Sequence, residues 1–473
     1  MFKIFAGLSH VHFVGIGGAG MSGIAEVLLD YEVKVSGCDR SRSEAVARLE
    51  GLGVEVMIGH SADHLDGVDL VVKSSAIPDH NPEIQAARRR GITVVRRAEM
   101  LGELMRLKYG IAVAGTHGKT TTTSLIGTLL TETGLDPTVI VGGRMRVSGT
   151  GARVGKSEYL VAEADEFDRS FLRLAPVLAV ITTIDVDHLD TYADLDAIRQ
   201  AFFDFADRVP FFGQIILCLD DQNIQQLLPR LALSHRIVTY GMSPQADLTA
   251  RDVEPTETGC RFTVVAGDDE IGVIEVPMPG RHNVQNTLAA VAVGRAVGIP
   301  FDKIAAALAA FGGVHRRFER LGSWNGAAVV DDYAHHPTEV AATLQAARQA
   351  FPKGRIHAVF QPHLFSRTRD LCDDFGRALL AADEAVVTAI YASREQPIEG
   401  VSGDDVVQSA RRSGHRRVEF CAEWSSDVTK VLERRVEEGR LGEGDVILTL
   451  GAGDIYRLAH RLGQDGAKEG GGS

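Results

Sequence analysis

Two glycine-rich stretches in this sequence have the residue types that bind phosphate groups. One of them, AVAGTHGKTTTTS at residues 112–124, places Gly-Lys-Thr directly before a helical pattern. The usual triphosphate-binding pattern, G-x-x-x-x-G-K-[ST], requires a glycine where this chain has Val113. The missing glycine implies a shorter loop and disfavours a typical GTPase or motor ATPase.

The residues of this loop still predict binding of a nucleoside triphosphate. Successive backbone N–H groups from Gly115 to Lys119 can form an anion-binding concavity. The Lys119 side chain can reach the outer phosphates, and the Thr120 hydroxyl can hold Mg²⁺. A helix start that is merely rich in threonine would leave Gly-Lys-Thr at a strand end unexplained.

Acidic residues follow the next two strand patterns, in VAEADEFD (161–168) and TTIDVDHLD (182–190). The carboxyl ends of neighbouring parallel strands meet at one ligand crevice, and Mg²⁺ prefers oxygen ligands. We therefore expect Glu163 and His188 beside the metal, although a solvated turn explains some of these acids equally well. Three further acids are expected at the surface or behind the metal ligands: Asp165, Glu166 and Asp168.

The other glycine-rich stretch, GIGGAG at residues 15–20, fits G-x-G-x-x-G between a strand and a helix. Small residues there let the backbone approach a pyrophosphate, whose charge is met by free N–H groups at the helix start. Asp39 ends the next strand, where a ribose-binding acid is expected. The stretch predicts a dinucleotide or nucleotide-sugar site. The alternative is a purely structural role, in which the glycines allow the helix to pack closely on the strand.

Two polar segments near the C-terminal half, DDYAHHPTE (331–339) and QPHLFSRTRD (361–370), each follow a strand pattern. The histidine pair suggests zinc, but neither an H-E-x-x-H pattern nor a cysteine supports a metal cage there. Tyr333, the histidines and Arg367 are better suited to a small zwitterion or a phosphate. Helix capping by Asp and Thr around Pro337 remains an alternative. The pair Arg316–Arg317 fits either a phosphate contact or an exposed basic pair.

Composition limits the classes of protein that fit. The chain has 473 residues, a formal net charge of −13, 45% hydrophobic and 24% charged residues. Such acidity disfavours a nucleic-acid or membrane-surface binder, which needs a basic face. Five scattered cysteines without a C-x-x-C pair indicate a reducing compartment. His10 and His12 interrupt the apolar start, so we expect no signal peptide, no membrane helix and a cytoplasmic protein.

Strand-like and helical patterns alternate along the chain, which predicts an α/β fold with mainly parallel sheets. Residues 237–280 contain short strand patterns that predict a small antiparallel sheet. The tail GAKEGGGS has the composition of a disordered segment. We expect strands at residues 69–77, 91–97, 158–165, 176–185, 215–219, 326–333, 355–361, 384–391 and 445–450.

Taken in order, the motifs resemble those of the Mur ligase family over nearly the whole chain. They are GIGGAGMSGIAEVLL, SSAI, AGTHGKTTTTS, EADE, DHLDTY, GRHNVQN, HRRFE, DDYAHHPTE and SRTRD. The short phosphate loop of that family explains Val113. The resemblance implies three domains: a Rossmann-like UDP-sugar domain at 1–107, a central P-loop ATPase at 108–314 and a Rossmann-like amino-acid domain at 315–473. The tail from about residue 466 is expected to be disordered.

The resemblance also implies a reaction, an ATP-dependent amide-bond formation in peptidoglycan precursor synthesis. The carboxylate of UDP-N-acetylmuramate would attack the γ-phosphoryl group of ATP, with Mg²⁺ bound, to give an acyl phosphate. The amine of L-alanine would then displace phosphate. This order makes chemical sense because a carboxylate is a poor electrophile until its oxygen becomes a good leaving group. We expect a monomer or a homodimer that takes part in cell-wall growth, cell shape and division.

Matching motifs assign roles to particular residues. Lys119, Glu163 and His188 would be catalytic, with Thr120, Glu163 and His188 holding metal. ATP would contact Gly115, Thr116, His117, Gly118, Lys119, Thr120, Thr121, His282, Asn283, Asn286, Arg317 and Asp332, the three from GRHNVQN on the adenosine side. The UDP-sugar would contact Gly15, Gly17, Gly18, Gly20, Asp39, Ser74 and Ser75. L-Alanine would contact Tyr333, His335 and Arg367. Several relatives carry a modified lysine after Asp-His, whereas residues 189–207 contain no lysine.

Three alternative functions stay open at this point. A tripeptide-recycling ligase would attach a peptide to the same UDP-sugar, but its first loop usually departs from the GIGGAGM that this chain keeps. An NAD-dependent dehydrogenase accounts for the first loop alone and leaves Gly-Lys-Thr without a task. A nucleotide-controlled binding module without turnover leaves Glu163 and His188 unexplained.

Overall fold

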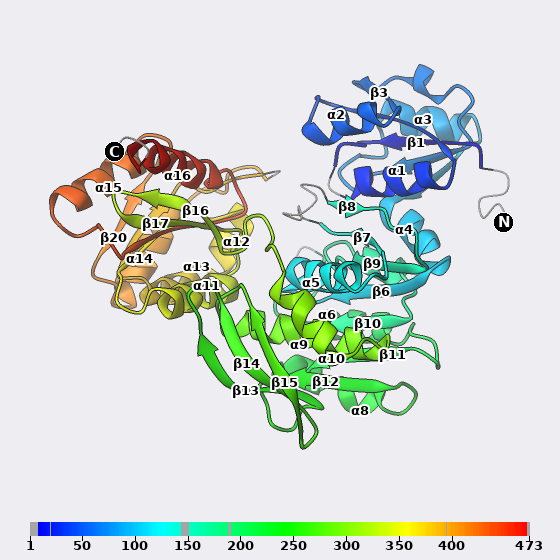
Figure 1. Cartoon of the computed structure of the whole chain (residues 1–473). Coiled ribbons are helices and arrows are strands. Elements are labelled where there is room, and N and C mark those ends of the chain that lie inside the picture. The colour runs from blue at the N-terminus through cyan, green and yellow to red at the C-terminus, as the bar shows by residue number, and fades with distance from the viewer. Residues whose placement is uncertain (1–7, 19, 143–150, 188–190, 394, 471–473) are drawn as a thin grey trace. The chain divides into compact units, whose positions relative to one another are not determined.

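The structure is a computed structural model that describes residues 8–18, 20–142, 151–187, 191–393 and 395–470. It contains three β-sheets with helices between their strands, which confirms the expected α/β fold class (Figure 1). By packing, the chain forms two compact units, and each is described by itself. Unit 1 holds residues 1–252, 262–274 and 285–314, and unit 2 holds residues 253–261, 275–284 and 315–473. The three domain boundaries drawn from the sequence stay a prediction.

The N-terminal sheet has the strand order β3-β2-β1-β4-β5 and is parallel throughout. Its strands are β1 (His10–Val14), β2 (Lys34–Asp39), β3 (Glu55–Ile58), β4 (Leu70–Lys73) and β5 (Thr93–Arg96). Its helices are α1 (Met21–Asp30), α2 (Glu44–Gly51), η1 (Ala62–Leu65), α3 (Pro82–Arg89) and α4 (Arg97–Arg106). The order reverses at β1, and the first glycine-rich stretch follows this strand, at the place where such sheets bind nucleotides.

The central sheet has the order β15-β14-β13-β12-β11-β10-β6-β9-β7-β8. Its strands are β6 (Tyr109–Ala114), β7 (Thr138–Ile140), β8 (Ala152–Arg153), β9 (Tyr159–Glu163), β10 (Leu178–Ile181), β11 (Gln214–Cys218), β12 (Ile237–Gly241), β13 (Leu248–Pro255), β14 (Cys260–Ala266) and β15 (Asp269–Val276). Its helices include α5 (Lys119–Glu132), α6 (Leu195–Ala206), α7 (Gln222–Gln225), α8 (Leu228–Leu231), α9 (Arg281–Ala296) and α10 (Phe301–Ala309), with η2 at Ser170–Arg173. Strand β6 lies between β10 and β9, so both acid-bearing segments flank the phosphate loop.

The strand patterns of residues 237–280 do not form a sheet of their own. They continue the central sheet as its edge, beginning with β12 parallel to β11. Strands β14 and β15 are joined by two residues, Gly267 and Asp268, a connection that fits only an antiparallel hairpin. Gly267 has φ +61°, as such a turn requires. The predicted antiparallel hairpin therefore exists, but it is part of the central sheet, which it joins through β13.

The C-terminal sheet has the order β16-β17-β21-β18-β19-β20, in which β16 pairs antiparallel to β17 and the other pairs are parallel. Its strands are β16 (Glu319–Trp324), β17 (Ala327–Asp332), β18 (Ile356–Phe360), β19 (Glu384–Thr388), β20 (Val418–Cys421) and β21 (Val446–Leu450). Its helices are α11 (Pro337–Ala350), α12 (Phe365–Asp370), α13 (Cys372–Ala378), η3 (Leu379–Ala381), α14 (Gly403–Arg412), α15 (Asp427–Glu437) and α16 (Tyr456–Gly470). The central strands β18 and β21 are buried along their whole length, because both faces of a parallel sheet are covered.

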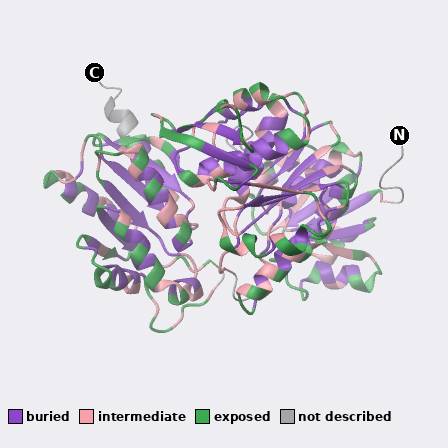
Figure 2. Ribbon diagram, turned by 90° about the horizontal axis from the view of Figure 1, so that it is seen from below, coloured by how far each residue is buried: buried purple, intermediate pink, exposed green. Residues whose placement is uncertain are grey.

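The C-terminal tail differs from the sequence-based expectation. Helix α16 continues through Gly470, so residues 466–470 are helical where disorder was predicted, and residues 471–473 lie outside the described part. An established helix gains one backbone hydrogen bond for each residue that it adds, which favours its continuation into the glycine-rich tail. Figure 2 shows that buried residues follow the strands, while exposed residues lie mostly on helices and turns.

Among the described residues, no helix combines the length and the apolar character that crossing a bilayer demands. All five cysteines are free thiols.

Candidate active site

The loop between β6 and α5 has the conformation of a phosphate-binding turn. Gly115 and Gly118 have φ of +135° and +81°, values that side chains disfavour. A Cβ atom at Gly118 would lie 2.6 Å from Oδ1 of Asn286. Gly118 also caps α5, so the free N–H groups of the first helical turn point at the loop.

Lys119 is partly buried in this loop and paired with Glu166. Its ammonium donates to both carboxylate oxygens of Glu166 at 2.9 and 2.8 Å and to the carbonyl oxygen of Gly115 at 2.7 Å. Burial would lower the pKa of Lys119, but the nearby carboxylates, Glu166 first, outweigh it and raise the pKa above its usual value. Lys119 is therefore a fixed cation.

Of the two places expected for Glu166, the surface is wrong, because this residue is buried as the partner of Lys119. The residue is only 2% exposed, and burial raises the pKa of its carboxyl group above the ordinary range. Its backbone carbonyl accepts a hydrogen bond from the Tyr192 hydroxyl at 2.7 Å. The sequence did not indicate this pairing, because a run of acidic residues gives no sign of which one turns inward.

The two expected metal ligands from this region lie side by side. The Thr120 hydroxyl donates to the Glu163 carboxylate at 3.1 and 3.0 Å, and the N–H of Gly142 donates to the same carboxylate at 2.8 Å. Strand pairing of Val113 with Glu163 sets this contact. The third expected ligand, His188, lies outside the described residues.

The rest of the loop is tied to the segment that follows β10. The N–H of Thr116 donates to the carbonyl of Thr183 at 2.9 Å, and the Thr116 hydroxyl accepts from the N–H of Asp185 at 2.9 Å. The His117 ring lies 3.2 Å from the Asp185 carboxylate. These bonds tie the loop to the segment after β10, and Thr121 is a buried residue of the first turn of α5.

Asn286 lies at the phosphate loop in this structure. Its Oδ1 accepts a hydrogen bond from the Thr122 hydroxyl at 3.1 Å, inside unit 1. The adenosine-side role implied for it by the resemblance is not tested by this contact. Asn283 belongs to unit 2, where its side-chain amide donates to the carbonyl of Pro279 at 2.8 Å.

The first glycine-rich stretch is built around Asp39. The N–H of Gly17 donates to the Asp39 carboxylate at 2.8 Å, and the N–H groups of Gly15 and Ile16 donate to the carbonyl of Cys38. A Cβ atom at Gly17 would come within 2.8 Å of the Ser43 hydroxyl and 3.0 Å of Asp39. The Asp39 carboxylate thus fixes the loop, besides lying where a ribose-binding acid is expected.

Of the two serines expected at this loop, Ser74 lies against it. Gly15 and Gly20 have φ of +83° and +75°, and a Cβ at Gly15 would lie 3.4 Å from Cβ of Ser74. Ser75 is exposed, and Gly18 donates its N–H to the carbonyl of Gly15. Arg97, which the sequence did not single out, places its guanidinium 3.0 Å from the position of a Cβ at Gly20.

In unit 2, three predicted ATP residues share one neighbourhood. Asp332 ends β17 and accepts the N–H groups of Phe318 at 2.7 Å and Ala334 at 2.8 Å. Burial raises the pKa of Asp332 to about 6, although Arg317 opposes that rise. Burial, helped by Arg317, lowers the pKa of His282 to about 4, so its ring is neutral at pH 7.

The predicted amino-acid residues are linked by a histidine that the sequence analysis did not select. The Tyr333 and His335 rings lie 5.2 Å apart, and the His335 and His363 rings 5.8 Å apart. Nδ1 of His363 lies 3.4 Å from Nη1 of Arg367, and its ring stacks on Tyr391 at 5.8 Å. Two strand ends therefore supply one aromatic and cationic cluster.

The two neighbouring histidines, His335 and His336, have different roles, and Arg316 has a structural one. His336 is buried and caps α11, with Nδ1 3.4 Å from the N–H of Thr338, while His335 joins the ring cluster. Arg316 binds Asp331 at 3.0 Å and the carbonyl of Gly453 at 3.1 Å, which makes it a structural residue. A helix cap around Pro337 does exist, but His336 makes it rather than the Asp and Thr that the alternative named.

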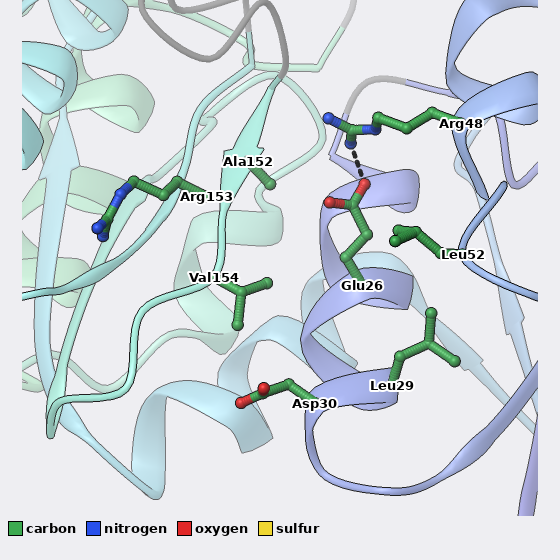
Figure 3. A pocket seen from close by; sticks show the side chains of 8 residues that line it. All are labelled: Glu26, Leu29, Asp30, Arg48, Leu52, Ala152, Arg153 and Val154. Atoms are coloured by element: carbon green, nitrogen blue, oxygen red, sulfur yellow. Dashed lines mark hydrogen bonds and ion pairs between the residues drawn. The ribbon is translucent and has the colours of Figure 1, made fainter.

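A hollow of about 530 Å³ lies elsewhere in unit 1 and has a different lining (Figure 3). The charges of Glu26 and Arg48 satisfy one another there. The remaining lining residues are Leu29, Asp30, Leu52, Ala152, Arg153 and Val154. None of these belongs to the predicted sites.

Comparison with known proteins defines the class. Three family models match in order: "Mur ligase family, catalytic domain" over residues 10–109, "Mur ligase middle domain" over 113–294 and "Mur ligase, glutamate ligase domain" over 316–453. Given also the relatives below, the chain belongs to the Mur ligase family, as the sequence motifs implied.

Individual relatives show which members of the family this chain is similar to. The chain is similar to UDP-N-acetylmuramate–L-alanine ligases of Sorangium cellulosum (51% identity, 96% of this chain and 95% of the relative) and Salinibacter ruber (50%, 96% and 94%). It is also similar to the crystal structure of the UDP-N-acetylmuramate–alanine ligase from Thermotoga maritima. That match has a TM-score of 0.79 and 30% identity, and it covers 97% of this chain and 99% of the other.

Proposed function

We propose that this chain is an ATP-dependent ligase that joins L-alanine to the carboxylate of UDP-N-acetylmuramate. The observation that carries the proposal is the loop in which Lys119, Thr120 and Glu163 converge on one side of a helix start. Similarity to ligases of that name over nearly the whole chain supports the substrates. Neither the dehydrogenase nor the tripeptide-recycling alternative gains support from these comparisons.

Each nucleotide would have its own loop. The N–H groups at the start of α1, with Arg97 beside Gly20, suit the pyrophosphate of the UDP-sugar. The loop at Gly115 suits the phosphates of ATP, where Lys119 would exchange its Glu166 and carbonyl partners for phosphate oxygens. The domain assignments made from the sequence, UDP-sugar at 1–107, ATP at 108–314 and amino acid at 315–473, are part of this proposal.

The donor set at Thr120 and Glu163 fits Mg²⁺. A hydroxyl and a carboxylate within 3.1 Å of each other offer hard oxygen ligands, and Mg²⁺ takes few of them from protein. Bound there, the ion would neutralise charge on the phosphates of ATP. The role of His188 as a further ligand stays a prediction.

This chain's residues would act mainly by positioning and charge stabilisation. Lys119 would hold the terminal phosphates while the sugar carboxylate attacks the γ-phosphorus and ADP leaves. In the resulting acyl phosphate, the L-alanine amine attacks the carbonyl carbon, and phosphate departs as the amide forms. The cluster of Tyr333, His335, His363 and Arg367 would hold L-alanine, with the guanidinium meeting its carboxylate.

The decisive experiment is phosphate release from ATP in the presence of Mg²⁺ and UDP-N-acetylmuramate, with each amino acid added separately. We expect release that requires both the UDP-sugar and L-alanine. Equal release without the sugar, or with an L-alanyl tripeptide in place of L-alanine, would contradict the proposal. The net negative charge, the scattered cysteines without a C-x-x-C pair and these substrates also favour a cytoplasmic enzyme.

A further inference from the structure

A cluster of histidine, cysteine and glutamate side chains lies in the N-terminal α/β region, and three of its four residues are buried. His12 lies on β1, Cys38 on β2, His64 on η1 and Glu83 at the start of α3. One ligand atom from each of these residues lies within 4.8 Å of all the others. The Cys38 thiol is 2.8 Å from Oε2 of Glu83, and Nε2 of His12 is 3.9 Å from Oε1. Nδ1 of His64 contacts the same Oε1.

One of these side chains points into the cluster without a hydrogen bond. The side chain of His12 is 0% exposed, and its Nε2 has no hydrogen-bond partner among the described residues. Its Nδ1 is 2.9 Å from the Ser36 hydroxyl, which in turn is 2.8 Å from Nε2 of His10. A second hydrogen bond of this kind fixes the orientation of a metal-binding imidazole and directs its other nitrogen at the ion.

We propose that His12, Cys38, His64 and Glu83 form a binding site for a zinc-class divalent cation. Zinc is held tetrahedrally at about 2.0–2.3 Å, which sets its ligand atoms roughly 3.3–3.8 Å apart, close to the spacing here. A thiolate and a carboxylate with two neutral imidazoles carry two negative charges, which balance a divalent ion. Sulfur and nitrogen ligands favour zinc over Mg²⁺.

His60 stands beside this ligand set. Its Nδ1 is 3.2 Å from the Cys38 sulfur and 3.2 Å from Oε2 of Glu83. It would hold the thiolate and the carboxylate in place once the thiol proton is released on metal binding. Without a metal, burial raises the pKa of the Cys38 thiol far above its ordinary value, so the proton is retained.

The site would stabilise the loop proposed for the UDP-sugar. The carbonyl oxygen of Cys38 accepts the N–H groups of Gly15 at 2.9 Å and Ile16 at 3.0 Å. A metal ion that anchors Cys38 therefore anchors the start of the glycine-rich loop. Ion binding to the folded state also raises stability by mass action.

The test is metal binding by the untagged full-length protein. The chain is stripped with a chelator and titrated with Co²⁺ in excess Mg²⁺ and ATP, so that the phosphate loop is already filled. We expect one equivalent of Co²⁺ to bind with a sulfur-to-cobalt charge-transfer band and tetrahedral visible bands. Cys38→Ser should abolish the charge-transfer band and weaken binding at least about tenfold, and His12→Gln should weaken it similarly. Absence of the band in the wild-type protein would overturn the proposal.

Matched controls separate the site from other thiols and from folding failure. Cys372→Ser removes a half-buried cysteine of the other unit and should leave the band unchanged. A band that survives Cys38→Ser would refute the assignment. Should either cluster variant fail to fold, the wild-type protein decides: stoichiometric Zn²⁺ should raise its melting temperature relative to the chelated form, and an unchanged melting temperature refutes the site. None of these readouts depends on ligase activity.

Discussion

The two glycine-rich loops of this protein differ in what surrounds the same kind of turn. The loop at Gly15–Gly20 offers backbone N–H groups, and its own carboxylate, Asp39, is engaged by Gly17. The loop at Gly115–Gly118 is followed at once by a partly buried lysine, Lys119, and faced by two glutamates, Glu163 and Glu166. A pyrophosphate that is only bound needs neutral donors, whereas a phosphoryl group in transfer needs charges placed where charge develops. The contrast supports a binding role for the loop at Gly15–Gly20, called the binding loop below, and a reaction role for the loop at Gly115–Gly118, called the reaction loop.

The largest effect should come from Lys119→Ala, which removes the fixed cation of the reaction loop. We expect turnover to fall about a thousandfold, because one preorganised charge on the transferred group is lost. The structure adds an expectation that the sequence did not provide. Glu166 would lose its partner, so the variant should also lose roughly 3 kcal/mol of stability. Steady-state phosphate release and thermal melting measure the two effects.

The double variant Lys119→Ala/Glu166→Gln separates these effects. It removes the buried charge left behind, so melting temperature should recover toward the wild-type value while turnover stays low. Recovery of turnover in the double variant, or near-normal turnover in Lys119→Ala, would remove the reaction role of this loop.

The next effect concerns the proposed metal position. Glu163→Gln keeps a hydrogen-bond acceptor for Thr120 but removes the negative charge that a divalent ion needs. We expect about a hundredfold lower turnover and a higher Mg²⁺ concentration at half-maximal rate. A Mg²⁺ titration measures this shift. Asp168→Asn, a charge change in the same segment, is the control and should leave the titration unchanged.

A smaller effect is expected at the binding loop. Gly17→Ala places a methyl group 2.8 Å from the Ser43 hydroxyl and 3.0 Å from Asp39, which forces the loop to shift. A loop that holds the UDP-sugar, as proposed, would bind it equally in ground and transition states, so KM for the UDP-sugar should rise about tenfold with little change in kcat. A fall in kcat at saturating sugar, without a change in KM, would break the division between the two loops.

The smallest effect lies outside both loops and concerns acid stability. Burial first, and Arg435 next, lower the pKa of His357 to about 4, and its Nδ1 lies 3.4 Å from Arg435. The unfolded chain binds this proton near pH 6.5, so the stabilising contribution is complete above that pH and is lost as pH falls toward 4. His357 alone should lower stability by about 2 kcal/mol between pH 7 and pH 5.

His357→Gln tests this expectation because the amide oxygen can still accept from Arg435. The difference in melting temperature between pH 7 and pH 5 should be smaller in the variant than in the wild-type protein. An equal difference in both proteins would show that His357 does not carry the pH dependence. Activity at pH 7 should stay unchanged in the folded variant.

Much of the fold and part of the site were predictable from sequence. The order of strands and helices follows from apolar runs and their periodicity, and β17, β18, β19 and β21 lie inside the expected ranges. Thr120 and Glu163 were predictable as neighbours because Glu163 ends β9 and Thr120 lies at the start of the helix that follows the adjacent strand β6. The family follows from motif order, which no single motif establishes. These features depend on residue type and spacing along the chain.

Other features were decided only by tertiary packing. The inward turn of Glu166 rather than Asp168, and the joining of Tyr333, His335 and Arg367 through His363, depend on contacts between distant segments. The same holds for His12, Cys38, His64 and Glu83, which come from four elements and share no spacing pattern. Sequence determines which groups are available and which elements carry them. Burial and long-range contacts, which no local pattern encodes, determine which of those groups meet and with what charge.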